Sequence, residues 1–265
     1  MAKALIYSKA NSKLALIWYT SLVNAMEKAI KIPLGNKQYI YGTFRGPLKS
    51  PLLVFVHGFT GYKDEHIFFN GARFFEKKGF SSFRFDLYNW KKDARKLEDC
   101  TLSLHGQDLD TVVEYFRKKG VKKIFVAGHS FGGVTVLLSK KKDFDAAVLW
   151  DSTGDKDVKL EAKYIKELDK YYRQESAYGF TISKKMYEEN NSKLKPTRLI
   201  KSMHMPVKVI VAGAGILVIE GKELFESANS PKDYAIIPKA THNFHEDGTE
   251  EILFQETYVW LKKFV

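Results

Sequence analysis

The sequence predicts an α/β fold in which a mostly parallel central sheet is covered by helices on both faces. Three observations lead to this prediction. Short apolar runs alternate with helical patterns along most of the chain after Met26. Some of those runs are continuously apolar, which is typical of strands buried on both faces. The length of 265 residues and the hydrophobic fraction of 45% fit one large domain with a sizeable core.

The predicted elements follow one another in regular order. Strands are expected at residues 29–34, 39–44, 52–56, 80–85, 123–127, 146–150, 207–212 and 234–237. Helices are expected at residues 66–78, 104–119, 132–140, 222–228 and 250–264. The first two strands form a hairpin around Gly35-Asn36, and Gly79 and Gly120 end the first two helices. Strands that alternate with helices in this way form a parallel sheet between two helical layers.

Residues 151–205 interrupt the alternation. This segment is charged and rich in tyrosine, lacks a clear strand pattern, and contains expected helices at 160–172 and 184–190. An excursion of this length between two core strands is uncommon unless it is functional. We therefore expect a helical lid insertion at about 152–205, within a domain that spans 28–265.

The first 27 residues are expected to form a helical extension. Their apolar run, LALIWYTSLV at 14–23, follows three lysines and is too short to span a bilayer. A cleaved signal peptide or a membrane-surface anchor is the alternative interpretation. The single cysteine, Cys100, excludes an internal disulfide and gives no support for secretion. We expect a cytoplasmic protein without stable membrane insertion.

The formal net charge of +12 raises the question of nucleic-acid binding. The excess comes mostly from short lysine pairs scattered along the chain, several of which close predicted helices, where cations complement the helix dipole. Zinc-finger spacings, RNA-binding signatures and long basic tracts are absent from the sequence. A solvated lysine-rich surface is the preferred interpretation, and specific nucleic-acid binding is not expected.

The strongest chemical signal is GHSFG at residues 128–132, between a predicted strand and a predicted helix. A G-x-S-x-G pattern in this setting is typical of a nucleophile elbow. The sharp turn forces Ser130 into a strained backbone conformation, and side chains larger than hydrogen at Gly128 or Gly132 would clash. The following helix directs its N-terminus toward developing negative charge. Ser130 is therefore predicted to be a nucleophile.

A second motif, FVHGFTG at residues 55–61, directly follows a buried strand. Together with the elbow it resembles the α/β-hydrolase fold, in particular bacterial acyl and cinnamoyl (feruloyl) esterases, from about residue 28 to the C-terminus. The resemblance implies that the backbone N–H groups of Phe59 and Phe131 form an oxyanion hole, where each donor contributes about 3 kcal/mol. His57 is interpreted as a buried histidine that braces this loop.

A third motif, IIPKATHNFHEDG at residues 236–248, follows the last predicted strand. The resemblance places a catalytic histidine here and implies that His242 is the general base that accepts the Ser130 proton. His245, three residues further on, makes only a weak metal-binding pattern. The other histidines discussed are interpreted as structural or surface residues: His66, His105, His129 and His204.

The turn in VIVAGAGILVI, residues 209–219, lacks an acid. The family usually carries its triad acid after this strand, in a G-x-x-D turn, and Ile216 stands where the aspartate is expected. A dinucleotide-binding loop is disfavoured because Val218 occupies the place of its third glycine. Without an acid, a triad loses on the order of 10⁴-fold in turnover.

Several carboxylates are candidates to replace the missing acid. Asp151, at the end of the strand that follows the elbow helix, is the best substitute, and its competing interpretation is a turn or helix cap. Glu220, four residues past Ile216, is the second candidate, and its competing interpretation is an exposed glutamate at a helix start. The less favoured carboxylates are Asp86, Asp155 and Asp157.

These motifs predict a serine hydrolase that cleaves carboxylic (acyl) esters through an acyl-Ser130 intermediate, without a metal or organic cofactor. Aromatic residues of the insertion would line an apolar acyl or aromatic pocket, or simply pack together: Tyr164, Tyr171, Tyr172, Tyr178 and Phe180. A thioesterase or serine peptidase using the same residues remains an alternative. A non-catalytic pseudo-hydrolase that acts as a binding protein is another, favoured by Ile216. The sequence does not identify the substrate, and it is compatible with a homodimer.

Overall fold

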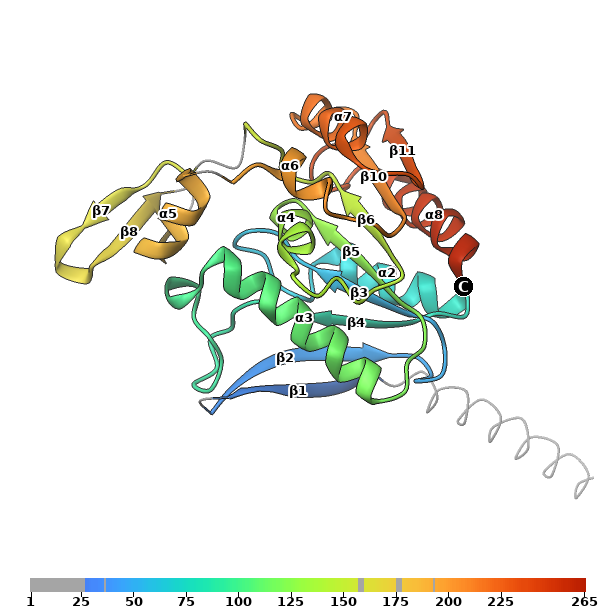
Figure 1. Cartoon of the computed structure of the whole chain (residues 1–265), viewed down its shortest axis with the longest axis horizontal. Coiled ribbons are helices and arrows are strands. Elements are labelled where there is room, and N and C mark those ends of the chain that lie inside the picture. The colour runs from blue at the N-terminus through green and yellow to red at the C-terminus, as the bar shows by residue number, and fades with distance from the viewer. Residues whose placement is uncertain (1–26, 36, 157–159, 175–177, 193) are drawn as a thin grey trace, which may run out of the picture.

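The computed structural model describes residues 27–265 except 36, 157–159, 175–177 and 193. Its centre is an eight-stranded sheet in the order β1-β2-β4-β3-β5-β6-β10-β11, with helices on both faces (Figure 1). β2 runs antiparallel to β1 and β4, and the other neighbouring pairs are parallel. The predicted α/β class and mostly parallel sheet are confirmed.

The core elements lie close to the predicted ranges. The strands of the large sheet are β1 (Lys28–Gly35), β2 (Gln38–Arg45), β3 (Leu52–Val56), β4 (Ser81–Phe85), β5 (Ile124–His129), β6 (Ala146–Trp150), β10 (Val207–Ala212) and β11 (Lys232–Ile237). The helices are α2 (His66–Lys77), α3 (Leu102–Lys118), α4 (Phe131–Leu138), α7 (Val218–Ser227) and α8 (Thr249–Leu261). α3 starts two residues earlier than predicted because the Thr101 side chain caps it by accepting the Leu104 N–H at 3.1 Å.

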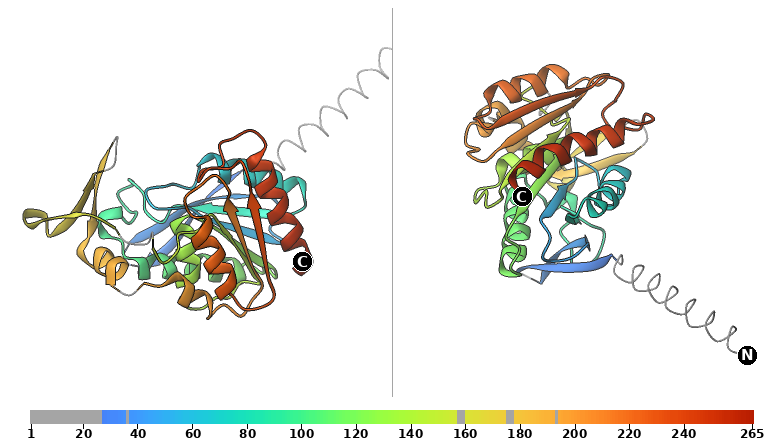
Figure 2. Two further views of the ribbon diagram at one scale, coloured as in Figure 1. Left: turned by 90° about the horizontal axis from the view of Figure 1, so that it is seen from above. Right: turned by 90° about the vertical axis from the view of Figure 1, so that its right-hand side faces the viewer.

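Two apolar cores sandwich the sheet. Along β5, Ile124 and Val126 pack into one core, and Phe125 and Ala127 pack into the other. The first core is closed mainly by α3, α4 and α7, and the second by α2 and α8, as the right-hand view of Figure 2 shows for α8 and α3. Because both faces are covered, the central strands are apolar at nearly every position, which explains their continuous apolar runs in the sequence.

The insertion differs from its prediction. Residues 160–172 do not form the expected α-helix: apart from one 3-10 turn at Lys166–Leu168, they contribute to a three-stranded antiparallel sheet, ordered β7-β8-β9, that continues to residue 183. Its strands are β7 (Lys163–Ile165), β8 (Lys170–Gln174) and β9 (Gly179–Ser183), followed by α5 (Lys184–Ser192) and α6 (Pro196–Ile200). The helix expected at 184–190 is confirmed as α5. The insertion projects from the core beside the N-terminal end of α3 (Figure 1).

Cross-strand aromatic pairing explains why strands form here. Tyr164 and Tyr171 face each other in register, with ring centroids 5.2 Å apart, and Tyr171 stacks on Tyr187 of α5 at 3.7 Å. Asp169 adopts a left-handed conformation (φ 48°) that reverses the chain between β7 and β8. Aromatic residues fit a pleated surface well, so this packing outweighs the helical pattern read from the charged positions.

The expected N-terminal helical extension lies outside the described residues, apart from Glu27. In the part of the chain that the structure describes, no helix is long and apolar enough to cross a membrane.

The Trp150 indole at the end of β6 links the sheet to α8. Its Nε1–H donates to the Thr257 hydroxyl at 2.9 Å, and both side chains are fully buried. We expect Thr257→Val to lower the free energy of unfolding by about 2 kcal/mol, because the indole N–H then lacks an acceptor. Thr257→Ser keeps the hydroxyl and should lose only about 1 kcal/mol for the missing methyl group. Urea denaturation of both variants is the measurement, and equal losses would contradict this role.

Candidate active site

Ser130 occupies the sharp turn between β5 and α4. Its backbone has φ 55° and ψ −123°, a strained conformation for a residue other than glycine. An added Cβ on Gly128 would lie 2.5 Å from the Gly132 carbonyl oxygen, and one on Gly132 would lie 2.2 Å from the Val56 oxygen. The turn therefore requires glycine at both flanking positions, for the steric reason that the motif suggested.

The loop after β3 passes directly over Ser130. An added Cβ on Gly58 would lie 3.1 Å from the Ser130 Cβ and 3.5 Å from its Oγ. The next residue, Phe59, packs its ring 5.6 Å from that of Phe131. Phe131 is the first residue of α4, so its N–H has no acceptor within the helix. Within the described ranges, no backbone hydrogen bond from the Phe59 N–H is formed either. Both amides are thus available beside Ser130.

His57 holds this loop in place. The Leu87 N–H donates to Nε2 of the ring at 3.0 Å, so the ring proton lies on Nδ1 and is donated to the Gly58 carbonyl at 2.8 Å. The ring is buried, and burial lowers its pKa, which keeps it neutral. A neutral histidine therefore ties the loop to the end of β4, consistent with its interpretation as a brace.

His242 and Asp151 form a hydrogen-bonded pair. His242 Nδ1 lies 2.6 Å from Oδ2 of Asp151, which is fully buried. The other carboxylate oxygen, Oδ1, accepts the Ala212 N–H at 3.0 Å. Both carboxylate oxygens therefore have donors, as a buried charge requires. Because Nδ1 donates to the carboxylate, Nε2 of His242 is left as the acceptor.

The topology explains how Asp151 reaches the histidine. β6 and β10 are parallel neighbours, so Asp151 leaves β6 beside the turn that follows β10. An added Cβ on Gly215 in that turn would lie 3.6 Å from Asp151 Oδ2. The Ile216 side chain is 83% exposed. The carboxylate of Asp151 thus lies next to the turn in which the resemblance implied an acid and Ile216 stands instead.

The other carboxylates have different surroundings. Glu220 is buried in the first turn of α7 against Gly154, and among the described residues it makes no hydrogen bond to His242. Asp86 accepts the Lys63 N–H at 2.9 Å. Asp155 accepts the N–H and hydroxyl of Thr197 at 2.9 and 2.8 Å. Asp157 lies outside the described residues.

Comparison with known proteins identifies the family of the chain. The sequence model of the alpha/beta hydrolase fold family matches residues 51–183, which is half of the chain. The chain belongs to this family. No curated protein sequence matches it significantly.

Solved structures share the fold of this α/β hydrolase. Est1E from Butyrivibrio proteoclasticus, solved with bound ferulic acid, is 20% identical with a TM-score of 0.74, covering 89% of this chain and 99% of that one. The esterase domain of a Rhodothermus marinus protein is 16% identical with a TM-score of 0.72, covering 90% and 99%. Dienelactone hydrolase from Anabaena variabilis is 15% identical with a TM-score of 0.68, covering 91% and 99%. At these identities the likeness establishes the fold.

The α/β hydrolase has a further contact at the site that sequence reasoning missed. Nε2 of His129 donates to the His242 carbonyl oxygen at 2.8 Å, and the two ring centroids are 4.7 Å apart. Burial, together with the nearby His242, lowers the pKa of His129 to about 3, so the ring is neutral. The last residue of β5, directly before Ser130, therefore also holds the His242 loop. The sequence feature that could have indicated this contact is a histidine directly before the serine, at the end of a strand buried on both faces.

The remaining predicted residues are spread around the site. Tyr172, Tyr178 and Phe180 line a cavity of about 1050 Å³, whereas Tyr164 and Tyr171 pack against each other. His245 stacks on His66, with centroids 4.4 Å apart. The described residues contain no group of three or more potential metal ligands placed to hold an ion.

The buried histidines of the α/β hydrolase predict a loss of stability in acid. Burial lowers the pKa of His105 and His129 to about 3, and lowers that of His57. The pKa of a histidine in the unfolded chain is 6.5, and a lower pKa in the folded state means that the fold favours the neutral ring. The resulting stability is fully present above pH 6.5 and is lost as the pH falls toward 3. Each such histidine should contribute a slope of about 1.4 kcal/mol per pH unit.

Unfolding in urea at several pH values below neutrality measures this slope. His129→Gln keeps a hydrogen-bond donor but does not titrate, so its stability should fall less steeply with acid than that of the native chain. Parallel slopes for the two proteins would contradict the assignment of His129 as a buried neutral histidine.

Proposed function

We propose that this α/β hydrolase cleaves carboxylic esters through an acyl-serine intermediate. Ser130 is the nucleophile, His242 the general base and Asp151 the acid of the triad. The backbone N–H groups of Phe59 and Phe131 form the oxyanion hole. The observation that carries the proposal is the 2.6 Å contact between His242 Nδ1 and the buried Asp151 carboxylate. Membership of the family and the hydrolase neighbours support hydrolysis in general.

Acylation begins when the Ser130 Oγ attacks the ester carbonyl carbon. His242 Nε2 accepts the hydroxyl proton as the C–O bond forms, and Asp151 stabilises the imidazolium that results. The carbonyl oxygen becomes an oxyanion, which accepts hydrogen bonds from the Phe59 and Phe131 amides. The intermediate then collapses: the bond to the alcohol oxygen breaks, and His242 returns the proton to the departing alcohol.

Deacylation repeats the sequence with water. His242 removes a proton from a water molecule as its oxygen attacks the acyl-Ser130 carbonyl carbon, and the same amides hold the oxyanion. When the bond to Ser130 Oγ breaks, His242 returns the proton to the serine and the carboxylic acid leaves. Throughout both steps, Asp151 orients the ring and balances the charge of the imidazolium.

The pair formed by His242 and Asp151 weakens the case for a non-catalytic binding protein. That alternative was favoured by Ile216, which cannot orient or charge-balance a histidine. A carboxylate delivered from β6 supplies the same function from a neighbouring strand. Thioesters and peptides would use the same reacting groups, so acetyl thioester and peptide substrates belong in the same assays.

Replacing the acid tests this proposal. We expect Asp151→Asn to lower the turnover of p-nitrophenyl acetate by about 10⁴-fold, because the amide favours the wrong tautomer of His242. Ser130→Ala should abolish the acyl-enzyme. Glu220→Gln is the matched control, and it should leave turnover within a few-fold of the native rate. An equal or larger loss in Glu220→Gln would assign the acid to that residue instead.

The turn after β10 provides a second test. Because this turn lies beside the Asp151 carboxylate, Ile216→Asp in the Asp151→Asn background should recover turnover on the order of 10-fold. Ile216→Asn in the same background controls for polarity and should recover none. Steady-state hydrolysis of p-nitrophenyl acetate is the readout, and identical rates for the two double variants would show that this turn cannot supply an acid.

A further inference from the structure

The lysines that are scattered along the sequence gather at one edge of the large sheet. The parallel strands start in register: Leu52 of β3 pairs with Ser81 of β4 and with Ile124 of β5. Ala147 of β6 pairs with Val207, the first residue of β10. The turns that precede these strands therefore lie side by side, and the helices that lead into those turns end at the same edge. Six segments form this basic edge: residues 45–51, 76–80, 117–123, 139–145, 201–206 and 262–265.

Direct contacts join neighbouring segments of the basic edge. The Leu52 N–H, directly after the first segment, donates to the Lys123 carbonyl oxygen at 2.9 Å. The end of α8 reaches the same edge, because Lys78 and Lys262 both lie over the Tyr258 ring, with Nζ at 5.2 and 5.8 Å from its centroid. In Figure 1 the ends of α3 and α8 lie on the side of the molecule away from the insertion. The basic edge is therefore one surface, opposite the edge that carries Ser130.

The basic edge carries the net charge of the whole chain. Its six segments contain fifteen lysines and arginines but three acidic residues, which gives a net charge of +12. The other 229 residues contain 28 basic and 28 acidic residues, so they are neutral overall. Such an asymmetry creates a strong positive potential on one side of the molecule, which attracts an anionic partner to that side.

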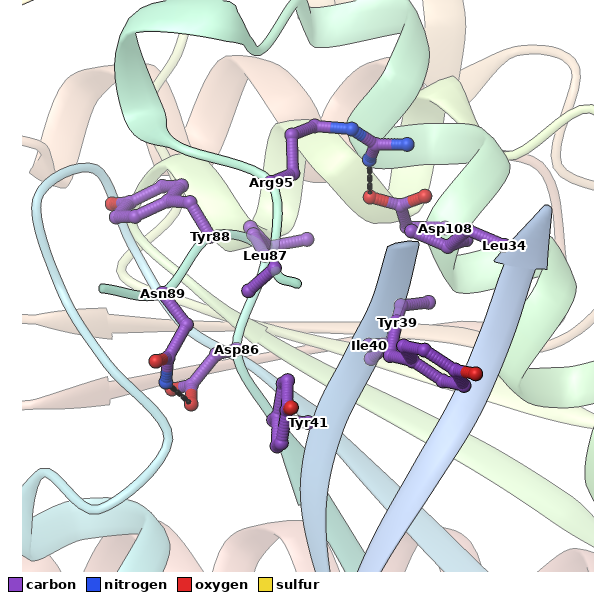
Figure 3. Close-up of a pocket in the computed structure, with 11 residues that line it drawn as sticks. Leu34, Tyr39, Ile40, Tyr41, Asp86, Leu87, Tyr88, Asn89, Arg95 and Asp108 are labelled. Carbon is purple, nitrogen blue, oxygen red and sulfur yellow. Dashed lines mark hydrogen bonds and ion pairs between the residues drawn. The ribbon is translucent and has the colours of Figure 1, made fainter. Parts of the chain in front are cut away.

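Few of the exposed lysines at the basic edge are held in ion pairs. Eleven of its lysines are exposed, and nine of these make no ion pair to any residue that the structure describes. The other two, Lys118 and Lys141, share the Glu114 carboxylate. By contrast, Arg95 at the opposite edge is neutralised by the buried Asp108 (Figure 3). The charge of the basic edge is thus open to solvent and to a partner.

The composition of the basic edge favours a membrane surface over a nucleic acid. Thirteen of its fifteen basic residues are lysines, and both arginines are engaged, Arg45 with Glu76 at 2.6 Å and Arg117 with Asp145 at 3.0 Å. Proteins read bases with arginine forks or with exposed aromatic rings on which bases stack. No aromatic side chain is exposed in these six segments, all of which the structure describes. An anionic bilayer requires only ammonium groups spread over a broad surface.

The N-terminal part of the sequence joins the fold at the basic edge. Glu27 Oε1 lies 3.4 Å from Arg45 Nη1, so residues 1–26 precede the fold beside these lysines. Residues 1–26 contain three lysines and no acidic residue, together with the apolar run at 14–23, which includes a tryptophan and a tyrosine. Basic residues next to apolar and aromatic ones are typical of segments that bind the interface of a bilayer.

We propose that the basic edge docks the chain on the surface of a membrane that contains anionic lipids. The contact is peripheral: the lysine ammonium groups bind phosphate and carboxylate oxygens of the headgroups, and the apolar run at 14–23 adds contact with the interface. Each lysine that reaches the surface strengthens binding about 5-fold. Because the attraction is electrostatic, it weakens as the salt concentration rises.

Docking by the basic edge orients the candidate active site away from the bilayer. Ser130 and Asp151 directly follow β5 and β6, at the other edge of the sheet. Strands of this length separate the two edges by about 20 Å, which exceeds the Debye length of about 8 Å at physiological ionic strength. The site therefore stays open to water and is screened from the charge of the membrane. The docking is thus independent of the proposed esterase function.

Sedimentation of the full chain with lipid vesicles tests the docking. One set of vesicles is phosphatidylcholine alone, and in the other about a third of the lipid is phosphatidylserine. We expect binding to the anionic vesicles to be about 100-fold tighter than to the neutral ones, and to be lost at about 0.5 M NaCl. Equal binding to both vesicles would assign the contact to the apolar run alone and overturn the inference, as would binding to neither.

Charge reversal locates the contact. The first variant reverses three exposed lysines of the basic edge: Lys119→Glu, Lys122→Glu and Lys140→Glu. The matched control reverses three exposed lysines after β4 and in the insertion: Lys92→Glu, Lys166→Glu and Lys185→Glu. The two variants have the same net charge, and circular dichroism checks that both are folded. The first should bind anionic vesicles about 100-fold more weakly than the native chain, and the control within a few-fold of it. Equal losses would show that net charge alone determines binding and would contradict the assignment.

A nucleic acid is the competing class of anionic partner. Fluorescence anisotropy with a labelled DNA duplex and a labelled RNA strand, at the salt concentration of the vesicle assay, compares the two classes. Binding to either that is tighter per negative charge than binding to anionic vesicles, and that the first variant loses while the control keeps it, would make the basic edge a nucleic-acid surface and overturn the membrane assignment. Weaker binding to both would support it.

Discussion

The site depends above all on the contact between the Asp151 carboxylate and the His242 ring. Together with the bond from the Ala212 N–H, this contact joins the end of β6, the end of β10 and the loop after β11, which are far apart in the sequence. A carboxylate with no exposed surface is stable only when its oxygens accept hydrogen bonds, and both do so here. Of the two bonds that satisfy the buried charge, the one from His242 Nδ1 also fixes the tautomer of the histidine.

The rest of the site is arranged around this contact by close backbone packing. The strained turn at Ser130 exists because Gly128 and Gly132 allow two backbone segments to approach within distances that a side chain would forbid. The loop after β3 is held over that turn by the neutral ring of His57, and the His242 loop is held by the neutral ring of His129. Two buried uncharged histidines thus position the loops on either side of the serine.

The sequence predicts the core of the fold well because its strands and helices are specified by local pattern and burial. It fails in the insertion, where the strands of residues 163–174 are stabilised by contacts such as Tyr171 on Tyr187 that span different elements. The elbow and the HGF loop are visible in sequence because steric limits act on adjacent residues. The sequence does not decide between Asp151 and Glu220, because that choice depends on how the ends of β6 and β10 lie side by side. The role of His129 and the shape of the cavity depend on long-range packing in the same way.

A crystal structure of the chain after reaction with diethyl p-nitrophenyl phosphate tests the central claim most directly. We expect phosphorus bonded to Ser130 Oγ and the phosphoryl oxygen within hydrogen-bond distance of the Phe59 and Phe131 amides. We also expect His242 Nδ1 to remain bonded to Asp151, with Nε2 facing the adduct. An adduct in which His242 has turned to another carboxylate, or in which the phosphoryl oxygen points away from both amides, would contradict it.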